Sequence, residues 1–113
     1  MSKDIIVVDG VEYVKKQIVC KDQVLVRTYS AGVHFGELEQ RDGKEVTLKN
    51  ARRIWYWDGA CSLSQIAVDG LPNDENQKIS VAVPSILLTE SIEIISMTET
   101  ATKNLSEVKE WKR

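Results

Sequence analysis

One segment concentrates side chains that bind phosphates and bases, the run Ala-Arg-Arg-Ile-Trp-Tyr-Trp-Asp-Gly at residues 51–59. Arginine binds phosphate through two parallel hydrogen bonds, and an aromatic ring stacks on a base. In a strand, alternation places Arg53, Trp55 and Trp57 on one face and Arg52, Ile54 and Tyr56 on the other. Either face therefore predicts a nucleotide-binding surface. The alternative is that the tryptophans pack in the core while Arg52 and Arg53 pair with surface carboxylates.

Two further groups of residues suit a small polar ligand. In the run 27–36, Arg27 and Tyr29 share a strand face, with hydroxyls and two glycines close by, although an ordinary strand-turn-strand explains them equally. His34 has no carboxylate or nucleophile beside it in the sequence, which weakens its case as a general base. At the C-terminus, Trp111 and Arg113 belong either to a solvated helix end or to a basic, aromatic flap over a neighbouring subunit.

The chain has few residues for metal or nucleophilic chemistry. Cys20 and Cys61 are isolated and His34 is the sole histidine, whereas a structural zinc site needs four such ligands. We therefore expect no metal, no cofactor and no disulfide framework, as in a reducing cytoplasm. Cys61 and His34 could form a nucleophile and base that degrade a ligand, but an inert buried cysteine is the simpler interpretation.

Composition limits the class of protein. With 113 residues, 42% hydrophobic and 28% charged, we expect one globular domain over residues 1–113. No apolar run approaches the roughly 20 residues of a membrane span, and the acidic start is atypical of a signal peptide. The net charge of -2 argues against a general DNA or RNA binder.

The elements that must position these residues are mostly strands. Asp9-Gly10 predicts a tight hairpin between Ile5–Val8 and Val11–Val14. Further strands are expected at Val24–Ser30, Val33–Gln40 and Glu45–Lys49, the last two joined by a turn at 41–44. Asn50 is expected to end that strand before an aromatic strand at Ala51–Trp57. A short strand through Ile79, Val81 and Val83 should stop at Pro84, and Ile86–Met97 should supply one or two more.

Two helices are expected. The first begins at Asp58 as N-cap, buries Leu63, Ile66 and Ala67, and stops at Gly70. The second is capped by Thr98 and buries Ala101, Leu105 and Val108. The sequence thus predicts an α+β fold, a mainly antiparallel β-sheet with one helix after the aromatic strand and one C-terminal helix.

Several motifs resemble the phage anti-Thoeris sponge family. They are Val26–Gly36, Gly43–Val46, Ala51–Ala60, Ser62–Ala67 and Ser91–Ile95 followed by Thr98-Glu99. The resemblance covers about residues 24–113, a family-like core, and leaves out residues 1–23, a variable N-terminal hairpin.

The resemblance implies binding without catalysis. Members sequester a glycocyclic ADP-ribose isomer, the signal of bacterial Thoeris immunity, in pockets between subunits, with arginines on the diphosphate and an aromatic on adenine. Some form hexamers and also hold CBASS cyclic di- or trinucleotides at separate sites. The resemblance implies that Arg27 binds the ligand, with Arg52 or Arg53 beside it and Trp55, Trp57 or Trp111 as the stacking residue.

A homo-oligomer, from dimer to hexamer, is expected on physical grounds as well. Nanomolar binding needs about -12 kcal/mol, which requires most of the nucleotide to be buried. A chain of 113 residues has little room for such a cavity beside its core. We expect a sponge in the host bacterial cytoplasm. The alternative is a phage protein that binds a host protein through its aromatic surface.

Overall fold

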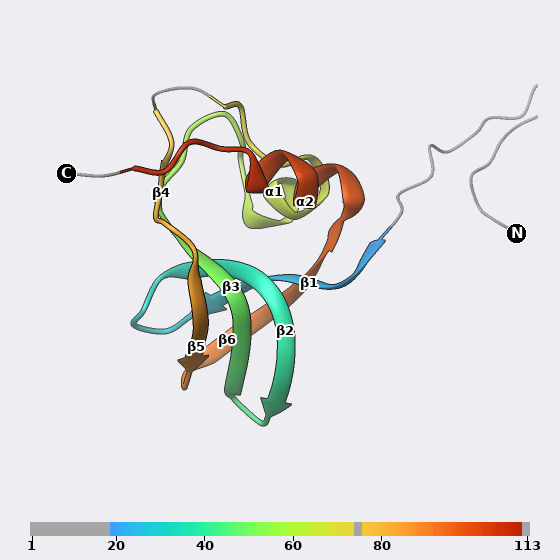
Figure 1. Cartoon of the computed structure of the whole chain (residues 1–113), viewed down its shortest axis with the longest axis vertical. Coiled ribbons are helices and arrows are strands. Elements are labelled where there is room, and N and C mark those ends of the chain that lie inside the picture. Colours follow the sequence, from blue (N-terminus) through green and yellow to red (C-terminus); the bar gives the residue numbers. More distant parts are fainter. Residues whose placement is uncertain (1–18, 74–75, 112–113) are drawn as a thin grey trace, which may run out of the picture.

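The computed structural model describes residues 19–73 and 76–111, which form an α+β fold with a mainly antiparallel sheet (Figure 1). The strands are β1 (Val19–Thr28), β2 (Val33–Asp42), β3 (Glu45–Tyr56), β4 (Lys78–Ile79), β5 (Val83–Leu88) and β6 (Ser91–Thr98). They are ordered β4-β3-β2-β1-β6, and β5 pairs with the first half of β3. Helix α1 (Leu63–Asp69) follows the aromatic strand β3, and α2 (Glu99–Ser106) follows β6, so the predicted fold class is confirmed.

The sheet separates two apolar clusters. The helix-side core joins one face of the sheet to α1 and α2, and includes Leu25, Phe35, Ile54, Ile66 and Leu105. The strand-side core lies on the opposite face and consists of Val24, Val26, Val46, Leu48, Ala51 and Leu88. The two helices lie together at one end of the sheet (Figure 1), where they cover only the helix-side core. Successive residues of each central strand therefore point into different surroundings.

A bulge in β3 corrects the expectation that Asn50 ends a strand. The strand continues through Asn50, whose φ of 52° is left-handed, a conformation that asparagine tolerates. The four residues of β3 from Lys49 to Arg52 lie opposite only three of β2, because Glu37 pairs with Lys49 and Phe35 with Arg52. The extra residue reverses the alternation, so that Leu48 and Ala51, three apart, share the strand-side core.

The segment from β4 to β6 also differs from expectation. Residues 80–82 separate β4 from β5, and Pro84 lies within β5 instead of stopping a strand. Proline is tolerated there because β5 is paired with β3 alone, which leaves an edge where no donor is needed. The region Ile86–Met97 is divided between β5 and β6, as one of the two predicted alternatives.

The helix starts give one correction and one confirmation. Ser62, not Asp58, caps α1: its backbone is extended and its hydroxyl accepts from the amide of Gln65. Asp58 instead exchanges two hydrogen bonds with the side-chain amide of Gln77. Thr98 caps α2 as predicted, and its hydroxyl also donates to the Val68 carbonyl at 2.6 Å, which ties α2 to α1.

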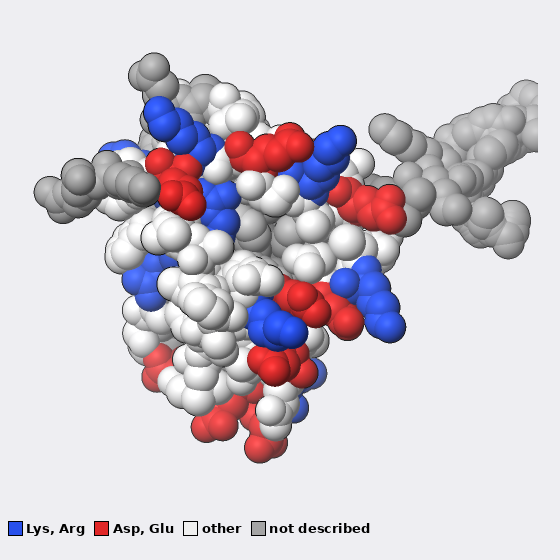
Figure 2. Space-filling model, in the orientation of Figure 1, with Lys and Arg blue, Asp and Glu red and all other residues white. Residues whose placement is uncertain are grey.

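The hairpin at residues 5–14 lies outside the described residues, as does Arg113. No helix among the described residues is long and apolar enough to cross a membrane. On the face shown in Figure 2, acidic and basic side chains are interspersed, with acidic ones gathered at the end where the β2–β3 turn lies.

Candidate functional site

Arg52 and Arg53 occupy opposite faces of β3, as the alternation predicts. Arg52 is on the helix side, where its Nε donates to the Ser80 carbonyl at 2.7 Å and its Nη1 to the Leu105 carbonyl at 3.0 Å. It is only 7% exposed, and burial lowers its pKa while the charge of Glu110 acts in the opposite direction. Arg52 therefore links β3 by hydrogen bonds to the segment between β4 and β5 and to α2.

Arg53 is held in a different way. Its Nε donates to His34 Nε2 at 3.1 Å, and its guanidinium carbon lies 4.6 Å from the centroid of the Trp55 ring. Its Nη1 and Nη2 have no hydrogen-bond partner, and no carboxylate pairs with it, among the residues the structure describes. Arg53 is half-buried, so a fixed and uncompensated cation reaches the surface.

His34 lies beneath Arg53 and is 1% exposed. Burial and, to a lesser extent, the charge of Arg53 lower the pKa of His34 to about 4, so the imidazole is neutral at pH 7. Because Nε2 accepts from Arg53, we assign the proton to Nδ1, which has no hydrogen-bond partner in the described part of the chain. His34 was a candidate ligand contact, but its burial places it behind the surface.

Aromatic rings and a lysine continue the surface from Arg53. The rings of Trp55 and Trp111 lie 6.5 Å apart at 59°, and Lys78 Nζ lies 5.5 Å from Trp111 and 5.8 Å from Tyr56. Trp55 and Tyr56 are 56% and 53% exposed. We call Arg53, Trp55, Tyr56, Lys78 and Trp111 the aromatic edge.

The C-terminal tail positions the last member of this edge. Glu110 makes a parallel bridge with Ile79, and the Trp111 amide donates to the Ile79 carbonyl at 2.8 Å. The tail thus runs along β4 and brings Trp111 to the exposed ring of Trp55 (Figure 1 shows the tail beside β4). Because α2 ends at Ser106, Trp111 is not part of a helix end, one of the two positions that the sequence offers for it.

Trp57 and Tyr29 are the aromatic candidates that do not belong to the aromatic edge. Core packing, the alternative that the sequence offers for the tryptophans, is correct for Trp57, which packs against the helix-side core, and wrong for Trp55, which is exposed. Trp57 follows the last residue of β3, where alternation no longer applies, and its Nε1 donates to the Ala60 carbonyl. Tyr29 is 81% exposed at the end of β1.

Arg27 also lies apart from Arg53. It pairs in register with Val33 and, through it, with Ile54, so its side chain is on the face opposite to that of Arg53. Arg27 and Glu93 are half exposed and form an ion pair at 3.8 Å. One ligand cannot contact both Arg27 and Arg53 within a single chain without spanning the sheet.

Sequence reasoning missed Lys78. Its place beside Tyr56 follows from the antiparallel pairing of β4 with β3, two strands that α1 and its flanking loops separate in the chain. The local sequence carries no signal for that pairing.

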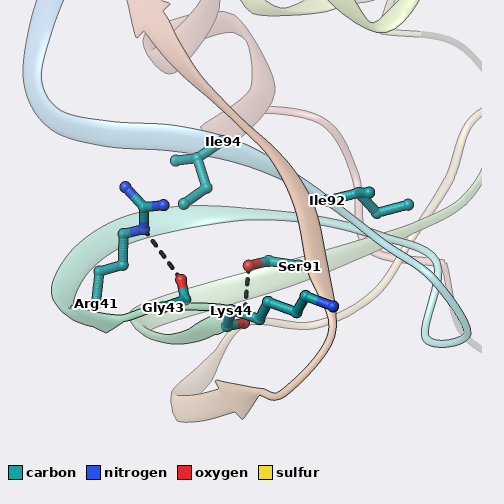
Figure 3. A pocket seen from close by; sticks show the side chains of 6 residues that line it. All are labelled: Arg41, Gly43, Lys44, Ser91, Ile92 and Ile94. Carbon is teal, nitrogen blue, oxygen red and sulfur yellow. Dashed lines mark hydrogen bonds between the residues drawn. The ribbon is translucent and has the colours of Figure 1, made fainter.

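Sequence reasoning also missed a cavity beside the β2–β3 turn. A cavity of about 460 Å³ is lined by Arg41, Gly43, Lys44, Ser91, Ile92 and Ile94 (Figure 3). Arg41 Nε bonds to the Gly43 carbonyl and Ser91 Oγ to the Lys44 carbonyl, so these groups serve the β2–β3 turn. The available signal is the pair of basic residues around Asp42-Gly43, a segment that the sequence predicts only as a turn.

The aromatic edge can bind a ligand, and Cys61 and His34 are not paired with each other as nucleophile and base. Cys61 Sγ contacts Gln65 Oε1 while His34 Nε2 accepts from Arg53, so the structure pairs each with a different residue. Within residues 19–73 and 76–111, no three His, Cys, Asp or Glu side chains gather as metal ligands. The aromatic edge offers a guanidinium, an ammonium and exposed aromatic rings, which suit an anion attached to a flat group.

Comparison with known proteins places the chain by family alone. No curated protein and no solved structure matches the sequence. One family model, described as a domain of unknown function (DUF6948), matches residues 21–105, from β1 through most of α2. The match includes Arg52 and four residues of the aromatic edge, Arg53, Trp55, Tyr56 and Lys78. The chain therefore belongs to the DUF6948 family.

Proposed function

We propose that the protein is a phage anti-defence sponge. It binds and sequesters the cyclic ADP-ribose-type nucleotide of Thoeris immunity and does not degrade it. The observation that supports this most is Arg53, which is oriented by His34 and Trp55 and has no carboxylate partner among the described residues. The resemblance of the motifs around Arg27 and Arg53 to anti-Thoeris sponges gives the class of ligand. In this proposal the protein acts in the cytoplasm of the host bacterium.

The aromatic edge provides a contact for each part of such a nucleotide. Arg53 and Lys78 would bind the diphosphate, since charge-assisted hydrogen bonds contribute about 1.5–3 kcal/mol each. Trp55 or Trp111 would stack on the adenine, a contact typically worth about 1–3 kcal/mol. His34 and Arg52 are too buried to be direct contacts in this arrangement.

A second copy of the chain would complete the site. The exposed ring of Trp55 shows that the aromatic edge is open, whereas a tightly held ligand has about 70–90% of its surface covered. Arg27, on the opposite side of the sheet, and the exposed Tyr29 would then come from the partner subunit. This arrangement places both groups of residues that the sequence singled out around one ligand.

The direct test is capture and release. The protein is incubated with the Thoeris signal, separated from free ligand and heat-denatured, and the released material is analysed by mass spectrometry. We expect the intact nucleotide. A chemically altered product would indicate an enzyme, and an absence of retained nucleotide would contradict the proposal and favour the host-protein alternative.

A matched pair of variants locates the site. Arg53→Gln should weaken nucleotide binding by about 10-fold to 100-fold, the effect of losing a charged hydrogen bond. Arg41→Gln removes an arginine at the β2–β3 turn, away from the aromatic edge, and should change the affinity less than threefold. Equal losses in both variants would mean that the ligand responds to overall charge and not to Arg53.

A further inference from the structure

Arg53 keeps its full charge because the group that orients it is neutral. Guanidinium groups are usually fixed by carboxylates, which also cancel much of the positive charge. Here the acceptor for Nε is the imidazole Nε2 of His34, and the described residues include no carboxylate paired with Arg53. The guanidinium carbon of Arg53 lies over the Trp55 ring, 4.6 Å from its centroid. The Nη1 and Nη2 edge is left for an oxyanion, which can bind it through two hydrogen bonds.

The surroundings of His34 do not call for a histidine. Its neighbours in register are Val26, which is fully buried in the strand-side core, and Arg53, and beyond Val26 lies Ile94. Arg53 is thus the charged group that faces it from the adjoining strands. The Nδ1 atom of His34 is buried without a partner among the described residues, an arrangement that an apolar side chain would avoid.

We propose that His34 is a positioning residue: a buried, neutral acceptor that orients Arg53 and leaves its charge available for the phosphate of the ligand. The inference rests on the proposed function for the identity of the ligand, and on the Arg53–His34–Trp55 contacts for the geometry. His34 acts through Arg53 and does not touch the nucleotide.

Three substitutions at His34 separate orientation from charge. The oxygen of glutamine reaches about as far as imidazole Nε2, so His34→Gln should keep Arg53 oriented and the nucleotide affinity within threefold of the original. His34→Glu supplies an acceptor at the same reach but cancels the charge, and should weaken binding at least tenfold. His34→Leu removes the acceptor, and should weaken binding about tenfold without lowering the melting temperature.

The outcomes that overturn the proposal are distinct. Unchanged affinity in His34→Glu would show that binding does not depend on a neutral partner for Arg53. Unchanged affinity in His34→Leu would show that binding does not depend on the orientation of Arg53 by residue 34. If the melting temperature falls together with the affinity in His34→Leu, that variant reports on folding. The pair His34→Gln and His34→Glu, matched in size, then decides: equal nucleotide affinity in the two would overturn the proposal.

A measurement without nucleotide keeps this inference separate from the proposed function. Sodium sulfate is titrated at pH 7 while the Arg53 Nε–H resonance is followed by NMR. We expect sulfate to shift this resonance in the original protein and in His34→Gln, and much less in His34→Glu and His34→Leu. If the original protein binds no nucleotide but shows this sulfate pattern, the sponge proposal fails and the role of His34 stands. Equal sulfate shifts in all four proteins would refute that role.

Discussion

At the scale of single residues, His34 combines burial with a cost. A buried donor without a partner typically costs about 1–3 kcal/mol, and the described structure leaves Nδ1 in that state. Residues that lower stability in this way are found where function requires them. The sequence predicts His34 as a ligand contact and carries no sign of its burial, because its depth depends on the long-range pairing of three strands.

The lowered pKa of His34 predicts how stability responds to acid. The unfolded chain takes up a proton at His34 near the ordinary pKa of 6.5, whereas the folded chain does so only near 4. Stability is therefore lost as the pH falls from 6.5 toward 4, by about 2–3 kcal/mol at pH 4.5. Urea unfolding at pH 7 and pH 4.5 measures this loss.

The control for this prediction is His34→Gln, which has no titrating group at the position. Other carboxylates and their pH effects are common to both proteins, so the loss in the original protein should exceed that in the variant by the same 2–3 kcal/mol. Parallel losses in the two proteins would mean that His34 titrates normally in the fold.

At the scale of elements, local patterns were sufficient where local physics decides. Alternation correctly placed Arg53 with Trp55 and opposite Arg52, and the spacing after Thr98 correctly gave the buried face of α2. The misplaced cap and strand ends had other causes. Asp58 is as good a cap as Ser62 by type, but Gln77, distant in the sequence, engages its backbone. Asparagine can end a strand or form a bulge, and the pairing with β2 decides between them.

The bulge in β3 makes a specific demand on the facing strand. A Cβ atom added to Gly36 would lie 2.9 Å from the Lys49 carbonyl oxygen and 3.0 Å from the Ala51 Cα, both backbone atoms that cannot turn away. Gly36→Ala should therefore destabilise the fold by about 1–3 kcal/mol, the usual cost of overpacking. Thermal unfolding measures it.

Gly43 provides the comparison for that substitution. It has a φ of 61° with open space around its Cα, so Gly43→Asn should change stability by less than about 1 kcal/mol. If Gly36→Ala were as mild as Gly43→Asn, the close approach of β2 to the bulge would not exist in solution.

At the scale of the whole molecule, apolar side chains remain at the surface. Among the described residues, the large exposed apolar side chains include Trp55, Tyr56, Val81 and Val83, which β3 and the β4–β5 segment carry. Exposed apolar groups on neighbouring elements mark an interaction surface. With the incomplete cover of the aromatic edge, they predict a stable homo-oligomer. Sedimentation equilibrium at micromolar concentration should give at least twice the chain mass of 12.8 kDa, and a mass of one chain would contradict the shared site.

The tail that carries Trp111 has a consequence for how such a protein can change over time. Of the described residues after Val108, none belongs to either apolar cluster, and Trp111 is held to β4 by a backbone hydrogen bond that any side chain except proline permits. Half of the aromatic pair can therefore be exchanged without repacking the interior. If the proposed function holds, selection on ligand preference acts here on other residues than selection on folding, so the aromatic edge can diverge quickly while the fold is kept.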